Sequence, residues 1–302
     1  MLYKNTLLIL ISTLTHTSIF NMSTQQEKAI ITKENAKELA LNSVIGGATG
    51  TIEVLATQPF LYGKNKLQQG QSLKEIIKEV SLHFRMLYRG CGISIVNMAP
   101  TTAIQITTHR ALHTLFSDDD LISSTLCSFA SGTVSALAST PTELVILHQQ
   151  NNGQSAYQTV RKIVATQPYS VLYRGVTPKA FREGLFTIGF FSLYPSIKNQ
   201  VHAHVIDNNA AAVFIAGAST GLFTSVISHP FDTISTIMQA DYERKNSTTM
   251  LQTAQHIHKK HGYRGFSKGA TLRSLNIALS IPIMTQAQQT LNTLARGNQK
   301  YE

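Results

Sequence analysis

An arginine and a glutamate stand side by side at Arg182 and Glu183, within the stretch KAFREGLF. A guanidinium binds a carboxylate or a phosphate through two parallel hydrogen bonds, and a carboxylate beside it can bind an ammonium group. Together the two side chains have the chemistry to hold a small charged or zwitterionic molecule. The alternative is an ordinary surface ion pair, which is common and contributes little to stability.

Three proline-containing segments repeat a further pattern of polar residues. The prolines occur in TQPFLYGKNKLQQ, STPTELVILHQQ and SHPFDTISTIMQ, 82 and 89 residues apart, and a glutamine stands nine residues after each. The position two residues after the proline holds Leu, Glu or Asp, and the position five residues after it holds Lys, Ile or Ser. In repeat order these residues are Pro59, Leu61, Lys64 and Gln68; Pro141, Glu143, Ile146 and Gln150; and Pro230, Asp232, Ser235 and Gln239.

The elements around the prolines repeat as well. Small residues stand 13 and 9 positions before each proline, and each segment leads on to YRG, YRG or SKG. Small residues four apart allow helices to pack closely in lipid, and a proline kinks a helix. The chain is therefore predicted to consist of three repeats built on kinked helices. The residues concerned are Gly46, Gly50 and Gly90; Ser128, Gly132 and Gly175; and Gly217, Gly221 and Gly269.

Composition and the remaining motifs narrow the function classes. The formal net charge of +10 suits nucleic acid, an anionic membrane surface or an anionic solute. The sequence has no G-x-G-x-x-G after a strand, no P-loop and no H-E-x-x-H, and its 11 histidines are scattered. Cys91 and Cys127 form neither a disulfide framework nor a zinc motif. We therefore expect no enzyme activity, no cofactor and no metal site.

Basic residues gather in the long connections between the expected helices. Residues 69–90, 151–175 and 240–269 contain 13 of the 26 Lys and Arg residues. Residues 115–122 contain three aspartates and no Lys or Arg, and residues 199–208 contain one aspartate. This segregation predicts a membrane protein whose long connections share one side. A nucleic-acid binder would instead carry its bases on one element, with aromatic residues between them.

In its prolines, glutamines, small-residue spacing and aromatic-base-glycine signals, the chain resembles the mitochondrial carrier family over residues 37–295. The resemblance implies an all-α fold with six transmembrane helices in three pseudosymmetric repeats and short helices in the long loops. The mean hydropathy of −0.01 is low for a membrane protein, and a bundle around a water-filled cavity accounts for it. We expect the long helices at residues 38–68, 90–116, 121–150, 176–198, 208–239 and 270–295.

The expected division of the chain begins with a leader or extension at residues 1–36. Met1 and Met22 are both candidate start residues, because the apolar run before Met22 lacks a clean signal-peptide cleavage site. Carrier repeats are then expected at residues 37–117, 118–207 and 208–302.

The resemblance also implies a gate at the matrix end of the bundle, where acids two residues after a proline pair with bases five residues after another proline. This arrangement pairs Leu61 with Ile146, Glu143 with Ser235, and Asp232 with Lys64. One ion pair is kept, one becomes a hydrogen bond and one becomes an apolar contact, so no charge is left unpaired. Gln68, Gln150 and Gln239 match the family's bracing positions, and Pro59, Pro141 and Pro230 match its helix kinks. At the opposite gate little is retained beyond Tyr194 and Lys198.

Substrate contacts in the family lie on the second helix of each repeat, seven residues after the repeat glycine. An adjacent Arg and Glu at this position resembles carriers of amino acids and of S-adenosylmethionine. Lys179 would add a further cation to the cavity, which makes a nucleotide carrier of the ADP/ATP type the main alternative. The substrate-binding candidates are Asn97, Arg182, Glu183, Arg273, Asn276 and Glu53.

As partners, the resemblance implies a small-molecule solute and membrane lipid, with cardiolipin as a candidate, and no nucleic acid. It implies a monomeric, multi-pass antiporter of the inner mitochondrial membrane that works by alternating access; the membrane would be that of host mitochondria if the source is a pathogen. Two other classes stay open. One is a non-transporting carrier-fold scaffold in a membrane, and the other is a soluble helical-repeat binder.

Overall fold

The structure is a computed structural model that describes residues 33–115, 121–204, 209–244 and 249–296. Within these ranges the chain is helical and contains no strand. The predicted leader at residues 1–36 lies almost entirely outside the described residues, as do the aspartates at 118–120 and 207. The long helical segments are α2 (Lys33–Gln68), α4 (Cys91–Leu115), α5 (Leu121–Asn152), α7 (Val176–Ile188) continued by α8 (Tyr194–His204), α9 (Asn209–Ala240) and α11 (Ala270–Arg296).

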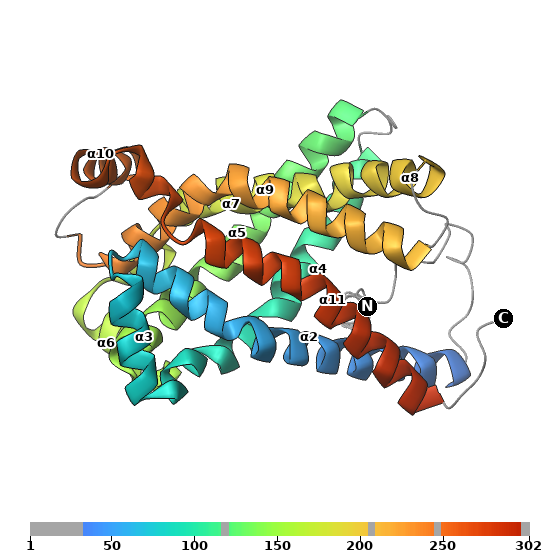
Figure 1. Ribbon diagram of the computed structural model, residues 1–302, viewed down its shortest axis with the longest axis horizontal. Helices are drawn as coiled ribbons and strands as arrows, with labels where there is room; N and C mark the ends of the chain where they lie inside the picture. The colour runs from blue at the N-terminus through green and yellow to red at the C-terminus, as the bar shows by residue number, and fades with distance from the viewer. Residues whose placement is uncertain (1–32, 116–120, 205–208, 245–248, 297–302) are drawn as a thin grey trace.

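The long helices form a closed ring. Helix α2 contacts α4, α4 contacts α5, α5 contacts α7, both α7 and α8 contact α9, α9 contacts α11, and α11 returns to α2. Figure 1 shows these helices running beside one another along the long axis of the molecule. The predicted all-α fold of six long helical segments in three repeats is confirmed.

Each predicted long loop carries a short helix, and all three short helices begin in the same way. They are α3 (Leu73–Leu82), α6 (Ala156–Thr166) and α10 (Met250–His261), and they gather at one end of the molecule (Figure 1). Ser72, Ser155 and Thr249 each cap the helix that follows in a capping box with the Glu or Gln three residues later. The hydrogen bond from the Ser72 backbone N–H lowers the pKa of Glu75 below its ordinary value. A 3₁₀ turn follows each short helix, at Phe84–Tyr88, Tyr169–Tyr173 and Tyr263–Ser267.

The prolines of the repeat lie inside the first long helix of each repeat. Pro59 stands within α2, Pro141 within α5 and Pro230 within α9. A proline inside a helix removes one backbone hydrogen bond and bends the helix axis. These are the positions that the sequence predicts as kinks.

Glycines fix how the two long helices of one repeat pack together. A Cβ atom added to Gly50 on α2 would lie 2.9 Å from Met98 Sδ on α4, and one added to Gly221 on α9 would lie 2.6 Å from Ile277 Cγ2 on α11. At Gly132 on α5 the Cβ would meet the backbone of Glu183 on α7. All three contacts join the residue nine positions before the proline to the residue eight positions after the repeat glycine.

The repeat glycines fix how neighbouring repeats meet. Gly90, Gly175 and Gly269 have φ angles of +85°, +79° and +81°, a backbone region that favours glycine. A Cβ on Gly90 would lie 2.8 Å from Ile146 Cγ2, one on Gly175 would lie 3.2 Å from the Ser235 carbonyl oxygen, and one on Gly269 would lie 3.1 Å from Lys64 Cγ. Each repeat glycine therefore packs against the position five residues after the proline of another repeat.

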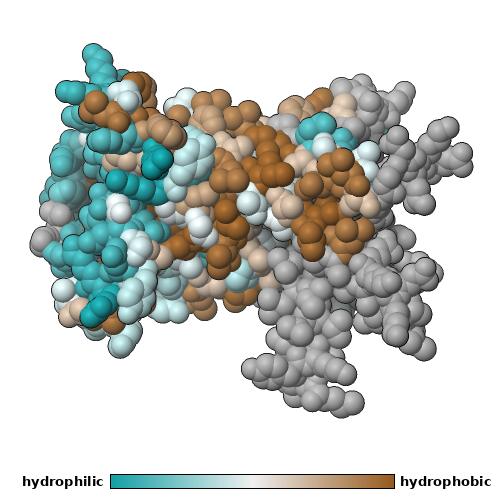
Figure 2. Space-filling model, turned by 90° about the horizontal axis from the view of Figure 1, so that it is seen from below, coloured by the Kyte–Doolittle hydropathy of each residue, from teal (hydrophilic) through white to brown (hydrophobic). Residues whose placement is uncertain are grey.

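Polar residues line much of the interior, whereas apolar residues lie outside. Ser128, Ser131, Ser135 and Ser139 on α5 are at most 1% exposed. Figure 2 shows a hydrophobic band across the middle of one face of the molecule and hydrophilic residues at the end that carries the short helices. Apolar side chains with half or more of their surface exposed include Val44, Leu137, Phe223 and Val226. Among the described helices, none contains an 18-residue stretch with both the hydropathy and the low charge expected of a membrane span.

The expected continuous helix over residues 176–198 is wrong in one respect. A π-helical turn at Gly189–Leu193 separates α7 from α8, and α8 then continues to His204. A Cβ atom on Gly189 would meet the side chain of Thr224 on α9, so the helix passes α9 unusually closely here. π-Turns inside helices are rare, and no sequence pattern near these residues predicts one here.

Candidate functional site

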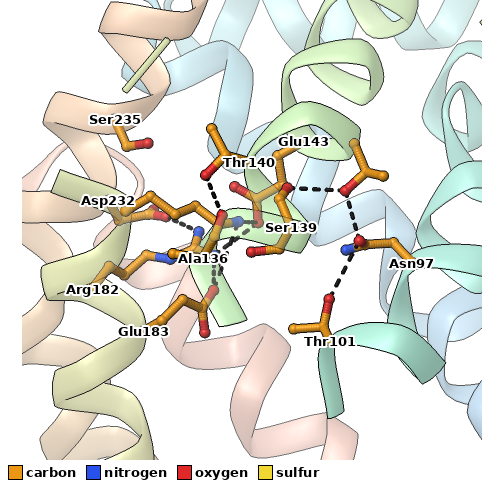
Figure 3. A network of polar contacts seen from close by, with 12 residues as sticks. Asn97, Thr101, Ala136, Ser139, Thr140, Glu143, Arg182, Glu183, Asp232 and Ser235 are labelled. Carbon is orange, nitrogen blue, oxygen red and sulfur yellow. Dashed lines mark hydrogen bonds and ion pairs between the residues drawn. The ribbon is translucent and has the colours of Figure 1, made fainter. Parts of the chain in front are cut away.

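Arg182 occupies the centre of a network of ion pairs inside the helix ring (Figure 3). Its Nη1 atom lies 2.7 Å from Asp232 Oδ1 on α9, and its Nη2 atom lies 2.8 Å from Glu143 Oε1 on α5. Nη2 also contacts the neighbouring Glu183 carboxylate. The Arg182 side chain is 13% exposed, so a residue predicted to bind substrate is held by two residues predicted to form the gate.

Lys179 lies one turn before Glu183 on α7 and joins the same network. Its side chain has no exposed surface, and its Nζ atom contacts Glu143 and lies 3.7 Å from Glu183 Oε1. The sequence predicts this lysine near the cavity but not in the gate. Its position four residues after Gly175 is the signal that could have identified it.

Asp232 gathers three bases and a glutamine. Lys64 Nζ lies 2.9 Å from Asp232 Oδ2 in a buried pair that the sequence predicts. Gln68 Nε2 donates to the same oxygen at 2.8 Å, as expected of a bracing residue. Arg182 is the second base, and Arg273 Nη1 lies 3.4 Å from Oδ2 while its Nη2 donates to Ser228 Oγ at 2.8 Å.

The expected hydrogen bond between Glu143 and Ser235 is not formed. Ser235 Oγ donates to the Gly175 carbonyl oxygen at 3.2 Å, and in Figure 3 no dashed line joins Ser235 to Glu143. Glu143 contacts Lys179 and Arg182 on α7. The physical reason is that two cations lie within reach of this carboxylate, and a charged hydrogen bond is stronger than one to a neutral hydroxyl.

Leu61 and Ile146 line one cavity of about 160 Å³, together with the charged gate residues Lys64 and Glu143 and with the polar residues Ser94, Asn97 and Gln239 among others. The sequence predicts that this pair forms an apolar contact, and the structure places both side chains at the same void. Near it, Asn65 Nδ2 donates to Gln150 Oε1 at 2.7 Å, which links α2 to α5. The Gln239 backbone carbonyl oxygen lies 2.9 Å from His148 Nε2.

The remaining substrate candidates form two further polar groups. Asn97 Oδ1 accepts from Thr142 Oγ1 at 2.6 Å and from Thr101 Oγ1 at 3.3 Å. Asn276 Nδ2 donates to the Thr57 carbonyl oxygen at 3.2 Å, and Glu53 accepts from Ser280 Oγ at 2.6 Å. The structure thus brings together Arg182, Glu183 and Arg273 through Asp232, and it holds Asn97 against α5 and Glu53 and Asn276 between α2 and α11.

Gln105 on α4 is a residue that sequence reasoning missed. Its Nε2 atom donates to Glu183 Oε2 at 3.4 Å and to Ser135 Oγ at 3.1 Å. It lies 15 residues after Gly90, and no charge or repeated spacing marks it in the sequence. Among the described residues there is no group of three or more His, Cys, Asp or Glu side chains that could hold a metal ion.

The ion pairs of the site join four bases to three acids. Lys64, Lys179, Arg182 and Arg273 contact Glu143, Glu183 and Asp232, whereas Glu53 lies apart and accepts from Ser280 Oγ. Buried charges are tolerated when each is paired, and removal of one partner is costly. An incoming solute must therefore exchange with these pairs and cannot simply add to them.

Comparison with known proteins shows three successive matches. A family model described as mitochondrial carrier protein matches residues 35–120, 117–205 and 207–297. The mitochondrial citrate transporter B of Aspergillus niger is 25% identical over 271 residues, which cover 83% of this chain and 92% of the relative. The mitochondrial glycine transporter of Xenopus tropicalis is 27% identical over 256 residues, 78% of this chain and 84% of the relative. A putative mitochondrial tricarboxylate transport protein of Caenorhabditis elegans is 28% identical over 266 residues, 80% of this chain and 84% of the relative.

The family matches extend over nearly all of the chain from residue 35 to residue 297, in the same three parts that the glycine and proline contacts define. The relatives are transporters of small molecules, and the family consists of multi-pass proteins of the inner mitochondrial membrane. With its closed ring of helices and its threefold repeat of contacts, the chain belongs to the mitochondrial carrier family.

Proposed function

We propose that the protein moves a small zwitterionic or charged metabolite, of the amino acid or S-adenosylmethionine type, across the inner mitochondrial membrane by alternating access. Arg182 and Glu183 form the core of its binding site. The observation that carries the proposal is the position of Arg182, whose guanidinium is shared among Glu143, Glu183 and Asp232. A solute carboxylate can bind this guanidinium in place of one of these three acids.

Binding and opening are coupled through this shared guanidinium. A carboxylate that pairs with Arg182 competes with Glu143 and Asp232, which join α7 to α5 and α9. Loss of these two contacts loosens the attachment of three helices to one another. A ligand shifts a conformational equilibrium only by its difference in affinity for the two states, and this competition supplies such a difference.

The mixture of charges at the site favours a solute with both signs of charge. Because Arg182 and Glu183 lie side by side, a zwitterion can bind Arg182 through its carboxylate and Glu183 through its ammonium. A nucleotide would bring its phosphates against Glu143 and Glu183. This repulsion makes the nucleotide carrier the weaker alternative.

The names of the relatives cover citrate, glycine, aspartate-glutamate and thiamine pyrophosphate, so the family match by itself leaves the solute open. The site residues therefore carry the choice of solute class. A single chain closes the helix ring, which supports a monomeric transport unit. Membrane lipid, with cardiolipin as the candidate, is the proposed neighbour of the exposed apolar band.

The experiment is uptake into proteoliposomes with a panel of labelled solutes: neutral and acidic amino acids, S-adenosylmethionine, citrate and ADP. Uptake that saturates for a zwitterion, and that is faster against a preloaded unlabelled solute, supports the proposal. Uptake of ADP alone would establish the nucleotide alternative. If correctly inserted protein transports none of the panel, the carrier-fold scaffold is the better description.

A further inference from the structure

The position four residues after the repeat glycine lies on the second long helix of each repeat. It holds Ser94 on α4, Lys179 on α7 and Arg273 on α11. Two of them are bases, and both contact an acid two residues after the proline of their own repeat. Lys179 contacts Glu143, and Arg273 contacts Asp232.

The packing of the helices explains why this position can reach the gate. On α7, Gly175 abuts Ser235 of α9, and Glu183, eight residues later, abuts Gly132 of α5. Lys179 stands midway between these two contacts. A residue four positions from Gly175 is about 6 Å further along the helix axis. From there its side chain reaches Glu143 at the acid position of α5.

The gate can be divided into three sectors. Each sector consists of the position two residues after a proline (the acid position), the position that faces it five residues after another proline (the base position), and the residue four positions after the repeat glycine (the helix residue). The third sector, Asp232, Arg273 and Lys64, is fully charged, with Lys64 at 2.9 Å and Arg273 at 3.4 Å from the Asp232 carboxylate. The second, Glu143, Lys179 and Ser235, keeps one acid and one base. The first, Leu61, Ser94 and Ile146, carries no charge.

In each repeat, the acid position and the helix residue are either both charged or both uncharged. Where the acid is present, the helix residue is a base, and where the acid position holds Leu61, the helix residue is Ser94. A fully buried ammonium such as that of Lys179 is tolerated only beside an acid. The first sector has neither an acid nor a base. Its three residues, Leu61, Ser94 and Ile146, all line the 160 Å³ cavity, which Lys64 and Glu143 of the other two sectors also line.

We infer that Lys179 is the gate base of the second sector, in place of the base that is absent at Ser235. The second sector is closed by an ion pair within its repeat, and the third by one pair within its repeat and one to Lys64 of the first repeat. The first sector is closed by packing alone and is the weakest part of the gate. This inference rests on the proposed alternating-access function, and Lys179 acts in it as a positioning residue.

The first test removes the lysine and returns a base to the position on α9. In purified protein, Lys179→Met should lower the thermal unfolding midpoint by about 5 °C, because Glu143 keeps only Arg182. Lys179→Met with Ser235→Lys should recover more than half of that shift. The matched control, Lys179→Met with Ile146→Lys, places the same charge in the uncharged sector and should recover nothing. Equal midpoints for the two double variants would overturn the inference.

The second test does not depend on the folding of the Lys179 variants. Leu61→Asp with Ser94→Lys installs the missing pair of the first sector. The double variant should unfold at a higher temperature than either single variant, each of which buries one unpaired charge. Additive effects of the two changes would show that position 94 does not reach position 61, and would contradict the assignment of Lys179.

A transport measurement separates a gate from a structural contact. Loss of a structural contact lowers efflux from preloaded liposomes equally with and without external solute. Loss of a gate contact raises the ratio of efflux measured without external solute to efflux measured with it. Lys179→Met should raise this ratio at least threefold, whereas Leu61→Asp with Ser94→Lys should lower it. An unchanged ratio overturns the gate role. The unfolding midpoints are measured without solute, so they test the pairing independently of transport. If the midpoints show coupling but no solute is transported, the pairing stands and the proposed function is rejected.

Discussion

Lys64 on α2 and Asp232 on α9 are 168 residues apart in the sequence and form a buried ion pair at 2.9 Å. The pair closes the ring between the first and the third repeat. Asp232 is also bound by Arg182 and Arg273, so it is the acid on which most bases of the site converge. This convergence makes the response to mutation unequal for the two partners.

Exchanging the two charges should give an asymmetric result. Asp232→Lys alone places a fourth cation among Lys64, Arg182 and Arg273 and should abolish both transport and stable purification. Lys64→Asp alone should be milder, because Asp232 keeps two bases. The double variant should restore only part of the uptake rate, since Arg182 and Arg273 then lack their acid. Lys259→Asp on the exposed face of α10 is the control for charge change, and a double variant no better than Asp232→Lys would contradict the pairing.

Arg182→Ala should abolish uptake of any carboxylate or phosphate solute while insertion into the membrane is retained. The variant leaves Glu143, Glu183 and Asp232 with fewer bases, so we also expect a lower unfolding midpoint. Arg182→Lys should keep some uptake with a raised KM, because an ammonium cannot bind a carboxylate through two parallel bonds. Arg161→Ala on the exposed face of α6 is the matched control. Unchanged uptake kinetics in Arg182→Ala would reject the site.

Gly175→Ala should destabilise the protein by about 1–2 kcal/mol, because the alanine would have to adopt a left-handed backbone conformation. The added Cβ atom would also lie 3.2 Å from the Ser235 carbonyl oxygen. Gly92→Ala on α4 meets no atom within 4 Å and should be neutral or slightly stabilising. The unfolding midpoints of the two variants check this contrast, and equal midpoints would argue against the close contact of α7 with α9.

Gln68→Leu should weaken the gate without breaking it. The change removes the 2.8 Å hydrogen bond to Asp232 and the 3.2 Å bond to Thr233, which together contribute about 1–3 kcal/mol. We expect a lower unfolding midpoint and faster exchange at saturating solute, because the closed state is the one that loses energy. Slower exchange at an unchanged midpoint would show that Gln68 does not brace the pair.

The long helices were predictable because the same three sequence features recur in each repeat, and each feature has its own physical effect. Small residues at Gly50 and Gly132 allow close packing, proline bends the helix, and Gly90 or Gly175 supplies the left-handed residue directly before the next helix. These requirements coincide at fixed spacings, so the sequence locates most ends of the six long segments to within two residues; the start of α2 differs by five residues and the end of α8 by six. The division into repeats at 37–117, 118–207 and 208–302 stays a prediction.

The gate was predictable only where a pair is kept between repeats. Spacing from the proline identified Lys64 and Asp232, because both charged residues remain at their positions. The partner of Glu143 was not found, because Lys179 lies outside the proline pattern and its reach depends on how α7 fits between α5 and α9. Charge alone could not show that Arg182 contacts Glu143, since both side chains could equally have faced water.

The π-turn at Gly189–Leu193 has a consequence for how the three repeats are compared. One additional residue in a helical turn rotates everything after it by about 100° relative to an uninterrupted α-helix. Side chains of α8 such as Tyr194 therefore face a different direction from the residues that plain counting would equate with them on α4 and α11. An alignment of the repeats that runs without a gap past this turn therefore pairs residues whose directions around the helix axis differ by about 100°.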